Sequence, residues 1–362
     1  MNKIVYVLNY TGDGGTEKYV LDLISAIGRK KCVLLYSKPG PSHKKFIELG
    51  IPMYQVTMRH PFDLIAAIQI KKIVEEEKAK IIHTQFLREN YISLLASFLG
   101  ADVRVIWTYH VNVPMPTYVK LLNRIMTRFN YKIISVAEYM KKELSKKGVP
   151  LNKITVIHNG IRIPSKVNTK VMKHDEKIIS VIGRLSEEKG HKFLLFSLAK
   201  LRKNYPELKW KLNVVGDGPL RQELMVLTEK LGLNLNVDFR GYVENIDSIY
   251  SNSDVIVIPS ENEALPFVAI EALAFKKPVV STNVGGIPEI IHHNKTGLLV
   301  NYGDTDTLSQ NIYRILSNEE LSKELSKNGQ EFFFKNLTIN QMLEKTLALY
   351  GITLSRKYEE DK

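Results

Sequence analysis

The sequence predicts an α/β protein made of two doubly wound, Rossmann-like domains, and three observations lead to this prediction. Short runs rich in Val and Ile alternate with helical segments of about ten residues along the chain, which is the order of βαβ units. Most of these runs are continuously apolar, as in parallel strands that are covered on both faces. The length of 362 residues suits two domains of ordinary size.

The expected strands form two series separated by a polar stretch at residues 161–176. The first series comprises residues 3–8, 32–36, 53–57, 80–84, 103–109, 132–136 and 154–158, and the second comprises residues 177–182, 211–215, 236–240, 255–259, 278–282 and 297–300. We therefore expect an N-terminal domain at residues 1–161 and a C-terminal domain at residues 162–339.

The composition is that of a globular protein of the cell interior. Hydrophobic residues make up 44% of the chain and charged residues 25%, which are ordinary fractions. The single Cys32 lies in an apolar run, so we expect no disulfide framework and a reducing compartment. No apolar run approaches the roughly 20 residues of a membrane-spanning helix, and the apolar run near the start is too short for a signal peptide. The expected location is cytoplasmic.

The net charge of +13 favours anionic partners, and much of it lies in one segment. Residues 115–150 hold eight Lys and Arg against two Glu, and a helix expected at residues 116–132 repeats basic residues every four positions. Residues 116–147 could therefore contact an anionic membrane surface, with the protein peripheral on the inner face of the cell membrane. Alternatively, they form the solvated face of an ordinary helix. No pattern typical of a nucleic-acid-binding domain accompanies the charge, so we expect no nucleic acid.

In doubly wound sheets, ligands bind beyond the carboxyl ends of the strands, so the loops there are candidate sites. The loop at residues 11–17 contains three glycines that permit close backbone approach to a ligand, or simply a flexible turn, and its spacing fits neither dinucleotide nor Walker motifs. His83 and His110 each follow an expected strand. Either could be structural, but the position of His110 favours a hydrogen-bonding group that titrates near neutral pH.

The second half has four more loops of this kind. Arg184 and Lys189, five residues apart after an expected strand, can both reach one diphosphate, or they are two solvated cations of a basic protein. The turns at residues 215–219 and 239–243 could frame a flat base. Glu263 and Glu271 stand eight residues apart, so a helix beginning at Leu265 could direct both carboxylates towards its N-terminal end.

That helix end suits a phosphate, because it presents unpaired N–H groups and the positive end of the helix dipole. A sugar nucleotide would supply hydroxyls for the carboxylates and a diphosphate for the helix end. The alternative is a surface helix with a solvated Glu and a second Glu in its middle.

Taken together, the motifs resemble glycosyltransferase family four, the retaining enzymes of the GT-B fold, over essentially the whole chain. The matching runs, in the order of the family, are GDGGTE, the His of TYH, VIHNGI, GRLSEEKG, VVGDGP, the acidic pair of ENEALPFVAIE, and PVVSTNVGGIPE. The resemblance implies two doubly wound domains facing across a cleft, with a nucleotide sugar held mainly by the second domain and the acceptor mainly by the first.

The resemblance also implies a role for each matching residue. Arg184 and Lys189 would neutralise the departing diphosphate, Glu263 would contact the donor sugar, and His110 would lie near the transferred sugar. The implied substrate-binding residues are Gly14, Gly15, Gly183, Gly216, Gly218, Val243, Leu265, Phe267, Val268 and Glu271, of which Glu271 would hold the ribose hydroxyls. No metal and no cofactor are expected, because positive side chains and a helix N-terminus would stabilise the leaving group.

The expected reaction is transfer of a hexose-type sugar, with retention, from a nucleotide diphosphate donor to an envelope glycan or a lipid-linked acceptor. Uridine diphosphate is the family's preference. The resemblance also implies that a helix within residues 340–362 packs back on the first domain. Two alternatives remain: a sugar-nucleotide 2-epimerase of the same architecture, which needs no acceptor, and a non-catalytic sugar-nucleotide-binding protein. Arg162 and Ala264 stand where the family usually has Asp and Gly, so the donor sugar stays open.

Overall fold

The computed structural model describes residues 3–164 and 175–352, and the chain divides into two compact units. The first unit contains the chain up to Asn159 together with the segment from Ile339 onward, and the second contains Gly160–Thr338. The expected division after residue 161 lies two residues beyond the observed one. Most of the expected linker at residues 161–176, and residues 353–362 of the expected C-terminal segment, lie outside the described residues.

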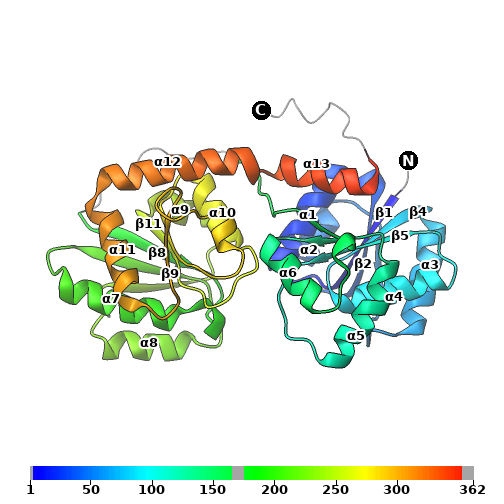
Figure 1. Ribbon diagram of the computed structural model, residues 1–362, viewed down its shortest axis with the longest axis horizontal. Coiled ribbons are helices and arrows are strands. Elements are labelled where there is room, and N and C mark those ends of the chain that lie inside the picture. The colour runs from blue at the N-terminus through cyan, green and yellow to red at the C-terminus, as the bar shows by residue number, and fades with distance from the viewer. Residues whose placement is uncertain (1–2, 165–174, 353–362) are drawn as a thin grey trace. The chain divides into compact units, whose positions relative to one another are not determined.

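The first unit is built on a seven-stranded parallel sheet in the order β3-β2-β1-β4-β5-β6-β7 (Figure 1). Its strands are β1 (Lys3–Tyr10), β2 (Cys32–Lys38), β3 (Met53–Gln55), β4 (Ala79–Thr84), β5 (Arg104–Tyr109), β6 (Lys132–Ser135) and β7 (Ile154–Val156). The order reverses between β1 and β4, so the loops that follow these two strands diverge there and leave room for a ligand.

The helices of the first unit follow the strands in alternation. They are α1 (Gly15–Ile27), η1 (Arg29–Lys31), α2 (His43–Glu48), α3 (Leu64–Glu76), α4 (Leu87–Phe98), α5 (Thr117–Met126), η2 (Thr127–Phe129), α6 (Glu138–Lys146), η3 (Leu151–Lys153) and the C-terminal α13 (Ile339–Tyr350). On one face of the sheet, side chains of β1 and β2 pack with α3 and α4 into an apolar core. The alternation of buried strands and half-buried helices is what the sequence pattern predicts.

The second unit repeats the plan with a six-stranded parallel sheet in the order β10-β9-β8-β11-β12-β13. Its strands are β8 (Lys177–Ile182), β9 (Trp210–Val215), β10 (Val237–Gly241), β11 (Val255–Ile258), β12 (Val279–Thr282) and β13 (Leu298–Val300). Its helices are η4 (Glu187–Lys189), α7 (His191–Asn204), α8 (Arg221–Lys230), α9 (Ile246–Asn252), α10 (Phe267–Ala274), η5 (Ile287–Glu289), α11 (Thr305–Ser317) and α12 (Glu319–Asn336). Here the strand order reverses between β8 and β11.

Side-chain caps fix the starts of several helices. Asp63, Asp304 and Asn318 precede α3, α11 and α12, and each accepts a hydrogen bond from the backbone N–H three residues later. Such a cap satisfies one of the N–H groups that a helix leaves unpaired at its first turn, and it contributes about 1 kcal/mol.

One expected helix is shorter than predicted. The continuous helix expected at residues 116–132 is wrong, because α5 ends at Met126, a short 3-10 turn follows, and Lys132 begins β6. The prediction extended the helix to Lys132 because Lys132 continues the four-residue repeat of basic side chains. The Lys132 ammonium instead donates to the carbonyl of Asn152 at 3.2 Å. All thirteen expected strands are present in the described part of the chain.

Candidate active site

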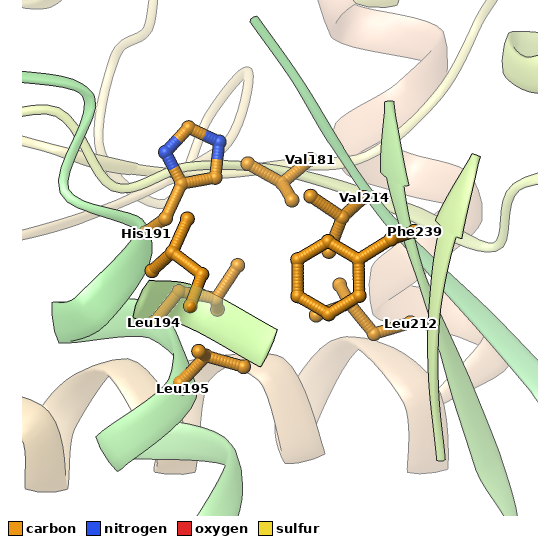
Figure 2. A pocket seen from close by; sticks show the side chains of 8 residues that line it. Val181, His191, Leu194, Leu195, Leu212, Val214 and Phe239 are labelled. Carbon is orange, nitrogen blue, oxygen red and sulfur yellow. The ribbon is translucent and has the colours of Figure 1, made fainter. Parts of the chain in front are cut away.

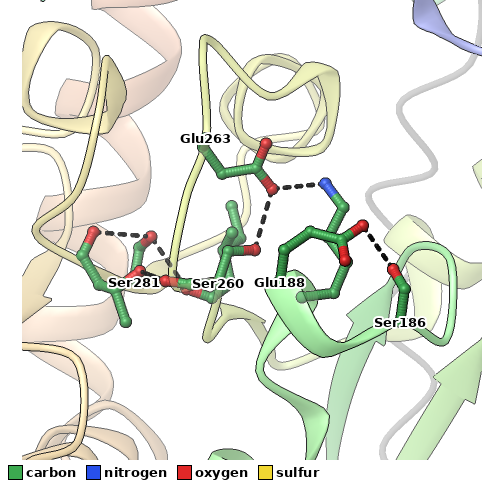
Figure 3. Close-up of polar contacts among 8 residues, drawn as sticks. Ser186, Glu188, Ser260, Glu263 and Ser281 are labelled. Atoms are coloured by element: carbon green, nitrogen blue, oxygen red, sulfur yellow. Dashed lines mark hydrogen bonds and ion pairs between the residues drawn. The ribbon is translucent and has the colours of Figure 1, made fainter. Parts of the chain in front are cut away.

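The loops that follow β8 and β11 meet where the strand order of the second unit reverses, and they bring a cation and a carboxylate together. The Nζ of Lys189, at the end of η4, donates to Oε1 of Glu263 at 2.6 Å (Figure 3). The same oxygen accepts the hydroxyl of Ser260 at 2.9 Å. The Glu263 side chain is only 10% exposed, so this ion pair is largely shielded from water and screened less than a surface pair. The structure thus joins two predicted site residues.

Two glycines allow these loops to approach so closely. Gly190, directly after Lys189, has φ +68°, and a Cβ there would lie 2.0 Å from the carbonyl oxygen of Pro259. Gly285 has φ +57°, and a Cβ there would lie 1.7 Å from the carbonyl oxygen of Glu263. No other amino acid fits either position without moving the backbone, so both glycines hold Glu263 and Lys189 in place.

Hydroxyl groups hold the β11 loop from the other side. The Thr282 hydroxyl donates to the carbonyl of Ser260 at 2.6 Å, and the Ser281 hydroxyl donates to the carbonyl of Ile258 at 3.1 Å. Ser260, Ser281 and Thr282 are buried. Sequence reasoning singled out none of the three, although the Ser-Thr pair at the end of β12 stands beside the strand-end loop that they brace.

Arg184 behaves differently from Lys189. Its side chain is exposed, and in the described part of the chain it makes no hydrogen bond or ion pair with Glu263. Its charge helps to lower the pKa of Glu188, whose main cause is the hydrogen bond from Ser186 at 2.5 Å. In the described residues Arg184 therefore stands outside the ion pair of Lys189 and Glu263.

The glycines of the β8 and β9 loops pack on each other. Gly216 has φ +126°, and a Cβ there would lie 2.0 Å from the carbonyl oxygen of Gly183. A Cβ on Gly218 would lie 2.5 Å from the carbonyl oxygen of Leu185. These predicted binding residues therefore bring two strand-end loops into backbone contact. Val243 lies after β10 and is partly buried.

Helix α10 begins at Phe267, two residues later than the expected Leu265, with Pro266 as its N-cap. Leu265 is buried at 4% exposure, so its side chain anchors the turn, whereas Phe267 and Val268 in the first turn are partly exposed. Pro266 brings no N–H group, and its fixed φ favours the start of a helix. As expected, Glu263 lies in the loop before the helix and Glu271 lies within it.

Glu271 is held by a residue that the sequence did not indicate. The hydroxyl of Tyr250, from α9, donates to Oε2 of Glu271 at 2.6 Å. Tyr250 is fully buried, and burial together with the carboxylate raises its pKa well above the ordinary value. Tyr250 therefore remains a hydrogen-bond donor at all working pH values and orients the Glu271 carboxylate.

His191 is a buried polar residue of the second unit that sequence reasoning also missed. Its ring lies beside Val181 above Leu194 and Leu195 (Figure 2). Neither ring nitrogen has a hydrogen-bond partner within residues 3–164 and 175–352. Burial lowers its pKa to about 4, so the ring is neutral at physiological pH and packs as an apolar group.

In the first unit, the glycine loop after β1 is closed by its own helix. The N–H of Gly14 donates to Oε2 of Glu17 at 3.0 Å, and Gly15 is the first residue of α1. Burial raises the pKa of Glu17, while hydrogen bonds from the loop backbone oppose the rise. A ligand phosphate at this helix end would have to displace Glu17 or use N–H groups other than that of Gly14.

His110 follows β5 and is held by two neighbours. Its Nε2 lies 2.8 Å from Oε1 of Gln85, and its ring lies edge-on to Tyr19 with centroids 4.9 Å apart. Burial lowers its pKa to about 3. The expectation that His110 titrates near neutral pH is therefore wrong, because the surrounding protein disfavours its charged form.

The second histidine, His83, belongs to a buried polar chain that ends on α13. Its Nδ1 lies 2.5 Å from the Tyr350 hydroxyl, and its Nε2 lies 2.6 Å from the Thr108 hydroxyl. The Tyr350 hydroxyl lies 3.2 Å from that of Tyr6. His83 is completely buried and therefore has a structural role, connecting the C-terminal helix to the ends of β4 and β5.

The basic segment carries an apolar stripe on its exposed side. Tyr118, Leu121, Ile125 and Phe129 are 54–67% exposed, and their spacing of three and four residues places them on one face. Leu122 and Met126 lie on a different side of the segment. These two pack on the core, against Tyr91, Leu94 and Val105.

Part of the predicted basic surface is neutralised or buried. Lys147 is buried at 7% exposure, contacts Asn112, and donates to the Tyr109 hydroxyl at 2.8 Å. Lys146 pairs with Glu143 at 2.8 Å. The exposed basic side chains beside the apolar stripe are those of Lys120, Arg124 and Arg128.

Neither membrane spans nor metal-ligand clusters are found in the described residues. No helix there has both the length and the apolar character needed to cross a bilayer. Groups of three or more His, Cys, Asp or Glu side chains arranged as metal ligands are likewise absent from this part of the chain.

Two family models match successive parts of the chain. The model described as Glycosyltransferase Family 4 matches residues 13–163, and the model described as Glycosyl transferases group 1 matches residues 164–332. The first match covers most of the first unit, and the second covers most of the second unit.

Curated relatives are similar over most of their length. N-acetyl-alpha-D-glucosaminyl L-malate synthase of Bacillus anthracis is 25% identical over 84% of this chain and 83% of its own. An alpha-1,4-N-acetyl-D-galactosaminyltransferase of Campylobacter jejuni, named as acting on a diphosphoundecaprenol-linked glycan, is 27% identical over 96% of this chain and 98% of its own.

Solved structures share the fold. A glycosyltransferase from Rickettsia africae matches with a TM-score of 0.84 and 24% identity, over 96% of this chain and 97% of that one. Anabaena HepE in complex with UDP matches with a TM-score of 0.85 and 19% identity, over 96% of this chain and 99% of that one. With the two parallel sheets, the strand-end loops and both family matches in place, the chain belongs to the family-4, group-1 glycosyltransferases and has the GT-B fold.

Proposed function

We propose that this glycosyltransferase transfers a hexose-type sugar from a uridine diphosphate donor to an envelope glycan or a lipid-linked acceptor. The observation that carries the proposal is the ion pair of Lys189 and Glu263 at the strand-order reversal of the second unit. There a cation and a carboxylate lie side by side. The cation suits the diphosphate of such a donor, and the carboxylate suits the hydroxyls of its sugar.

Donor binding would exchange partners within this pair. The ammonium of Lys189 would move to the diphosphate, and the exposed Arg184 would join it. Glu263 would accept hydrogen bonds from the sugar, while Glu271, held by Tyr250, would accept those of the ribose. The partly exposed Phe267 and Val268 at the start of α10 would direct their N–H groups to the donor.

We propose a metal-independent reaction with retention of configuration. As the bond between sugar C1 and the diphosphate oxygen breaks, its electron pair goes to the diphosphate, and negative charge grows there. The oxygen of the acceptor hydroxyl would bond to C1, and its proton would pass to the departing diphosphate. Lys189 and Arg184 would stabilise that charge in a partly dehydrated site. Membership of family four supports retention, which nuclear magnetic resonance of the product's anomeric proton can test directly. Activity that is unchanged by a chelator would support metal independence.

The acceptor side of the proposal rests on the first unit. The galactosaminyltransferase relative is named as acting on a lipid-linked glycan. The exposed apolar stripe Tyr118, Leu121, Ile125 and Phe129 beside a basic stripe is the pattern of a helix that lies in a membrane interface. We therefore propose a peripheral contact between α5 and an anionic membrane surface, where such an acceptor would be found.

The decisive experiment combines a donor panel with one substitution. Nucleotide sugars that bind should raise the melting temperature of the full chain, and we expect the largest rise with a uridine diphosphate sugar. Glu263→Gln should lower turnover about a hundredfold while UDP affinity changes little, because the group acts on the sugar rather than on the nucleotide.

A matched control stands on the same loop. Glu261 is exposed, and its backbone N–H donates to the carbonyl of Glu188 at 2.9 Å. Glu261→Gln removes the same charge two residues away and should leave turnover unchanged. Equal turnover of Glu263→Gln and the wild type would remove Glu263 from the reaction. The family membership does not favour an epimerase or a non-catalytic binder, and an acceptor-dependent product would exclude both.

A further inference from the structure

Gln85, directly after β4, is a buried amide whose two ends can be told apart by their partners. It is 1% exposed, and its Nε2 donates to the carbonyl of His83 at 3.3 Å. A backbone carbonyl only accepts hydrogen bonds, so the NH₂ end of the amide must face His83. The opposite end, Oε1, therefore faces His110.

This orientation dictates which nitrogen of His110 carries the proton. Oε1 of Gln85 only accepts, and it lies 2.8 Å from Nε2 of His110, so Nε2 must be the donor. A neutral imidazole carries a single N–H, so Nδ1 of His110 has a free lone pair. Within the described residues Nδ1 has no hydrogen-bond partner, and the side chain is partly exposed.

The ring cannot easily turn over to exchange its nitrogens. Tyr19 packs edge-on against it at an interplanar angle of 72° with centroids 4.9 Å apart. Tyr19 is itself buried, and its hydroxyl lies 3.4 Å from that of Thr108. A reversed ring would place a carbon atom against Oε1 of Gln85 and leave that buried oxygen without a donor, which carries a desolvation penalty.

We propose that Gln85 is a positioning residue that holds His110 in the Nε2–H tautomer, so that Nδ1 of His110 accepts a hydrogen bond from a hydroxyl of the sugar substrate. The identity of the ligand as a sugar rests on the proposed function, whereas the tautomer does not. The lowered pKa of His110, about 3, agrees with a ring that stays neutral and donates no proton to the reaction. His110 then selects for a ligand O–H, because a ligand group that can only accept finds no donor at Nδ1.

The tautomer can be measured without substrate by nitrogen-15 magnetic resonance of the full chain labelled at histidine. His110→Asn identifies the His110 signals. In the wild type we expect a protonated Nε2 and an unprotonated Nδ1 between pH 5 and 8. Gln85→Leu, which removes the acceptor, should yield a mixture of tautomers. A protonated Nδ1 in the wild type, or an unchanged Nε2–H tautomer in Gln85→Leu, would overturn the proposal.

Gln85→Glu keeps an acceptor beside Nε2 and covers the case in which Gln85→Leu does not fold. It should retain the Nε2–H tautomer and raise the pKa of His110, because a carboxylate stabilises the imidazolium. A matched control is Gln55→Leu: Gln55 also donates its amide to a strand carbonyl, that of Ser37 at 3.1 Å, but no hydrogen bond joins it to a histidine within the described residues. The control should leave the His110 signals in place, and an unchanged His110 pKa in Gln85→Glu would contradict the proposal.

The second half of the proposal needs a ligand. Addition of the uridine diphosphate sugar that most raises the melting temperature should shift the Nδ1 resonance of His110, and UDP alone should not. Gln85→Leu should lower turnover about tenfold, in line with the loss of one hydrogen bond, whereas Gln55→Leu should not. If no nucleotide sugar binds, the proposed function fails while the tautomer stands. If the sugar binds without a shift at Nδ1, the role assigned to His110 fails.

Discussion

The polar groups at the strand-end loops differ in kind between the two units. In the second unit they are ionised and paired: Lys189 lies against Glu263. In the first unit burial disfavours charge: it lowers the pKa values of His83 and His110 to about 3 and raises that of Glu89 to about 7. Both sets lie near the carboxyl ends of parallel strands in a doubly wound sheet, so the fold alone does not explain the difference.

The difference teaches how one architecture, used twice, serves two kinds of ligand. A charged ligand such as a diphosphate needs cationic side chains that can move to it. When no ligand is bound, an ion pair keeps such a cation neutralised by a carboxylate. Uncharged hydroxyls need directional donors and acceptors, which buried neutral groups supply because their partners fix them. Three substitutions test this contrast, in order of decreasing effect.

Gly190→Ala should disrupt the ion pair of Lys189 and Glu263 in the second unit. The substitution places a Cβ at 2.0 Å from the carbonyl oxygen of Pro259 at a residue with φ +68°, so the β8 and β11 loops must separate. We expect a loss of about 3 kcal/mol or more in the free energy of unfolding. UDP affinity should fall as well, because the displaced loop moves the Lys189 ammonium away from the position in which it would meet the diphosphate. Urea unfolding and calorimetric titration with UDP measure the two effects.

Gly303→Ala is the control for backbone strain alone. Gly303 also has a positive φ, +91°, but a Cβ there meets no atom within 4 Å. This variant should lose only about 1–2 kcal/mol and bind UDP as the wild type does. Similar losses in both variants would mean that the loop contact at Gly190 contributes nothing beyond strain.

Glu89→Gln tests the neutral character of the first unit. Glu89, in the first turn of α4, is 1% exposed, and its Oε2 has no hydrogen-bond partner in the described part of the chain. Burial raises its pKa from 4.5 to about 7. Above pH 7 the folded wild type therefore holds a buried charge that the variant lacks. At pH 8 we expect Glu89→Gln to be more stable by about 3 kcal/mol at most.

The advantage of Glu89→Gln should depend on pH in one direction. As the pH falls from 7 to 4.5, the folded wild type takes up a proton on Glu89 while the unfolded chain remains ionised, so the wild type gains stability and the difference shrinks. Urea unfolding at several pH values measures this. A difference that stays constant or grows on acidification would show that Glu89 is ionised in the folded protein.

The smallest effect per side chain is expected for vesicle binding by the basic side chains of α5, on the surface of the first unit. Changing Lys120, Arg124 and Arg128 together to Glu should abolish binding to vesicles that contain anionic lipid, because each basic side chain near such a surface contributes about 1 kcal/mol. Folding and UDP affinity should not change. Co-sedimentation with vesicles at low and high salt measures the effect.

An equal charge change in the second unit serves as the control. Lys203, Lys323 and Lys327 are exposed on α7 and α12, and their replacement by Glu alters net charge by the same amount. This control variant should bind vesicles more strongly than the α5 variant. Equal loss in both would assign the binding to overall charge, and no wild-type binding at low salt would remove the membrane contact.

Strand positions were predictable from the sequence because buried parallel strands require continuous apolar runs, which few other structures need. The ends of helices were less predictable: α5 ends at Met126 although its basic repeat continues to Lys132. A charge repeat carries little information about structure, since exposed positions accept any polar residue. The burial of Asn123 on α5, where it accepts from Tyr91, left no signal in the pattern of apolar residues.

For the candidate site, the sequence indicated charged residues and glycines but not the residues that hold them. Lys189 and Glu263 stand in strand-end loops, where functional groups gather, and were found there. Tyr250 and Gln85 act through contacts with residues 21 and 25 positions away, and no local spacing predicts such pairs. The pKa of His110 depends on its burial, which arises only when β4, β5 and α1 pack together.

The hydrogen bond from Tyr350 to His83 has a consequence for biosynthesis. The first unit is discontinuous along the chain, since its opening residues leave the ribosome before the second unit and α13 leaves after it. Until Tyr350 arrives, Nδ1 of His83 in the nascent first unit lacks its partner from α13, so its maturation must wait while Gly160–Thr338 is synthesised. A ribosome that stalls within the second unit therefore releases two unfinished halves rather than one finished half, and both become substrates for chaperones.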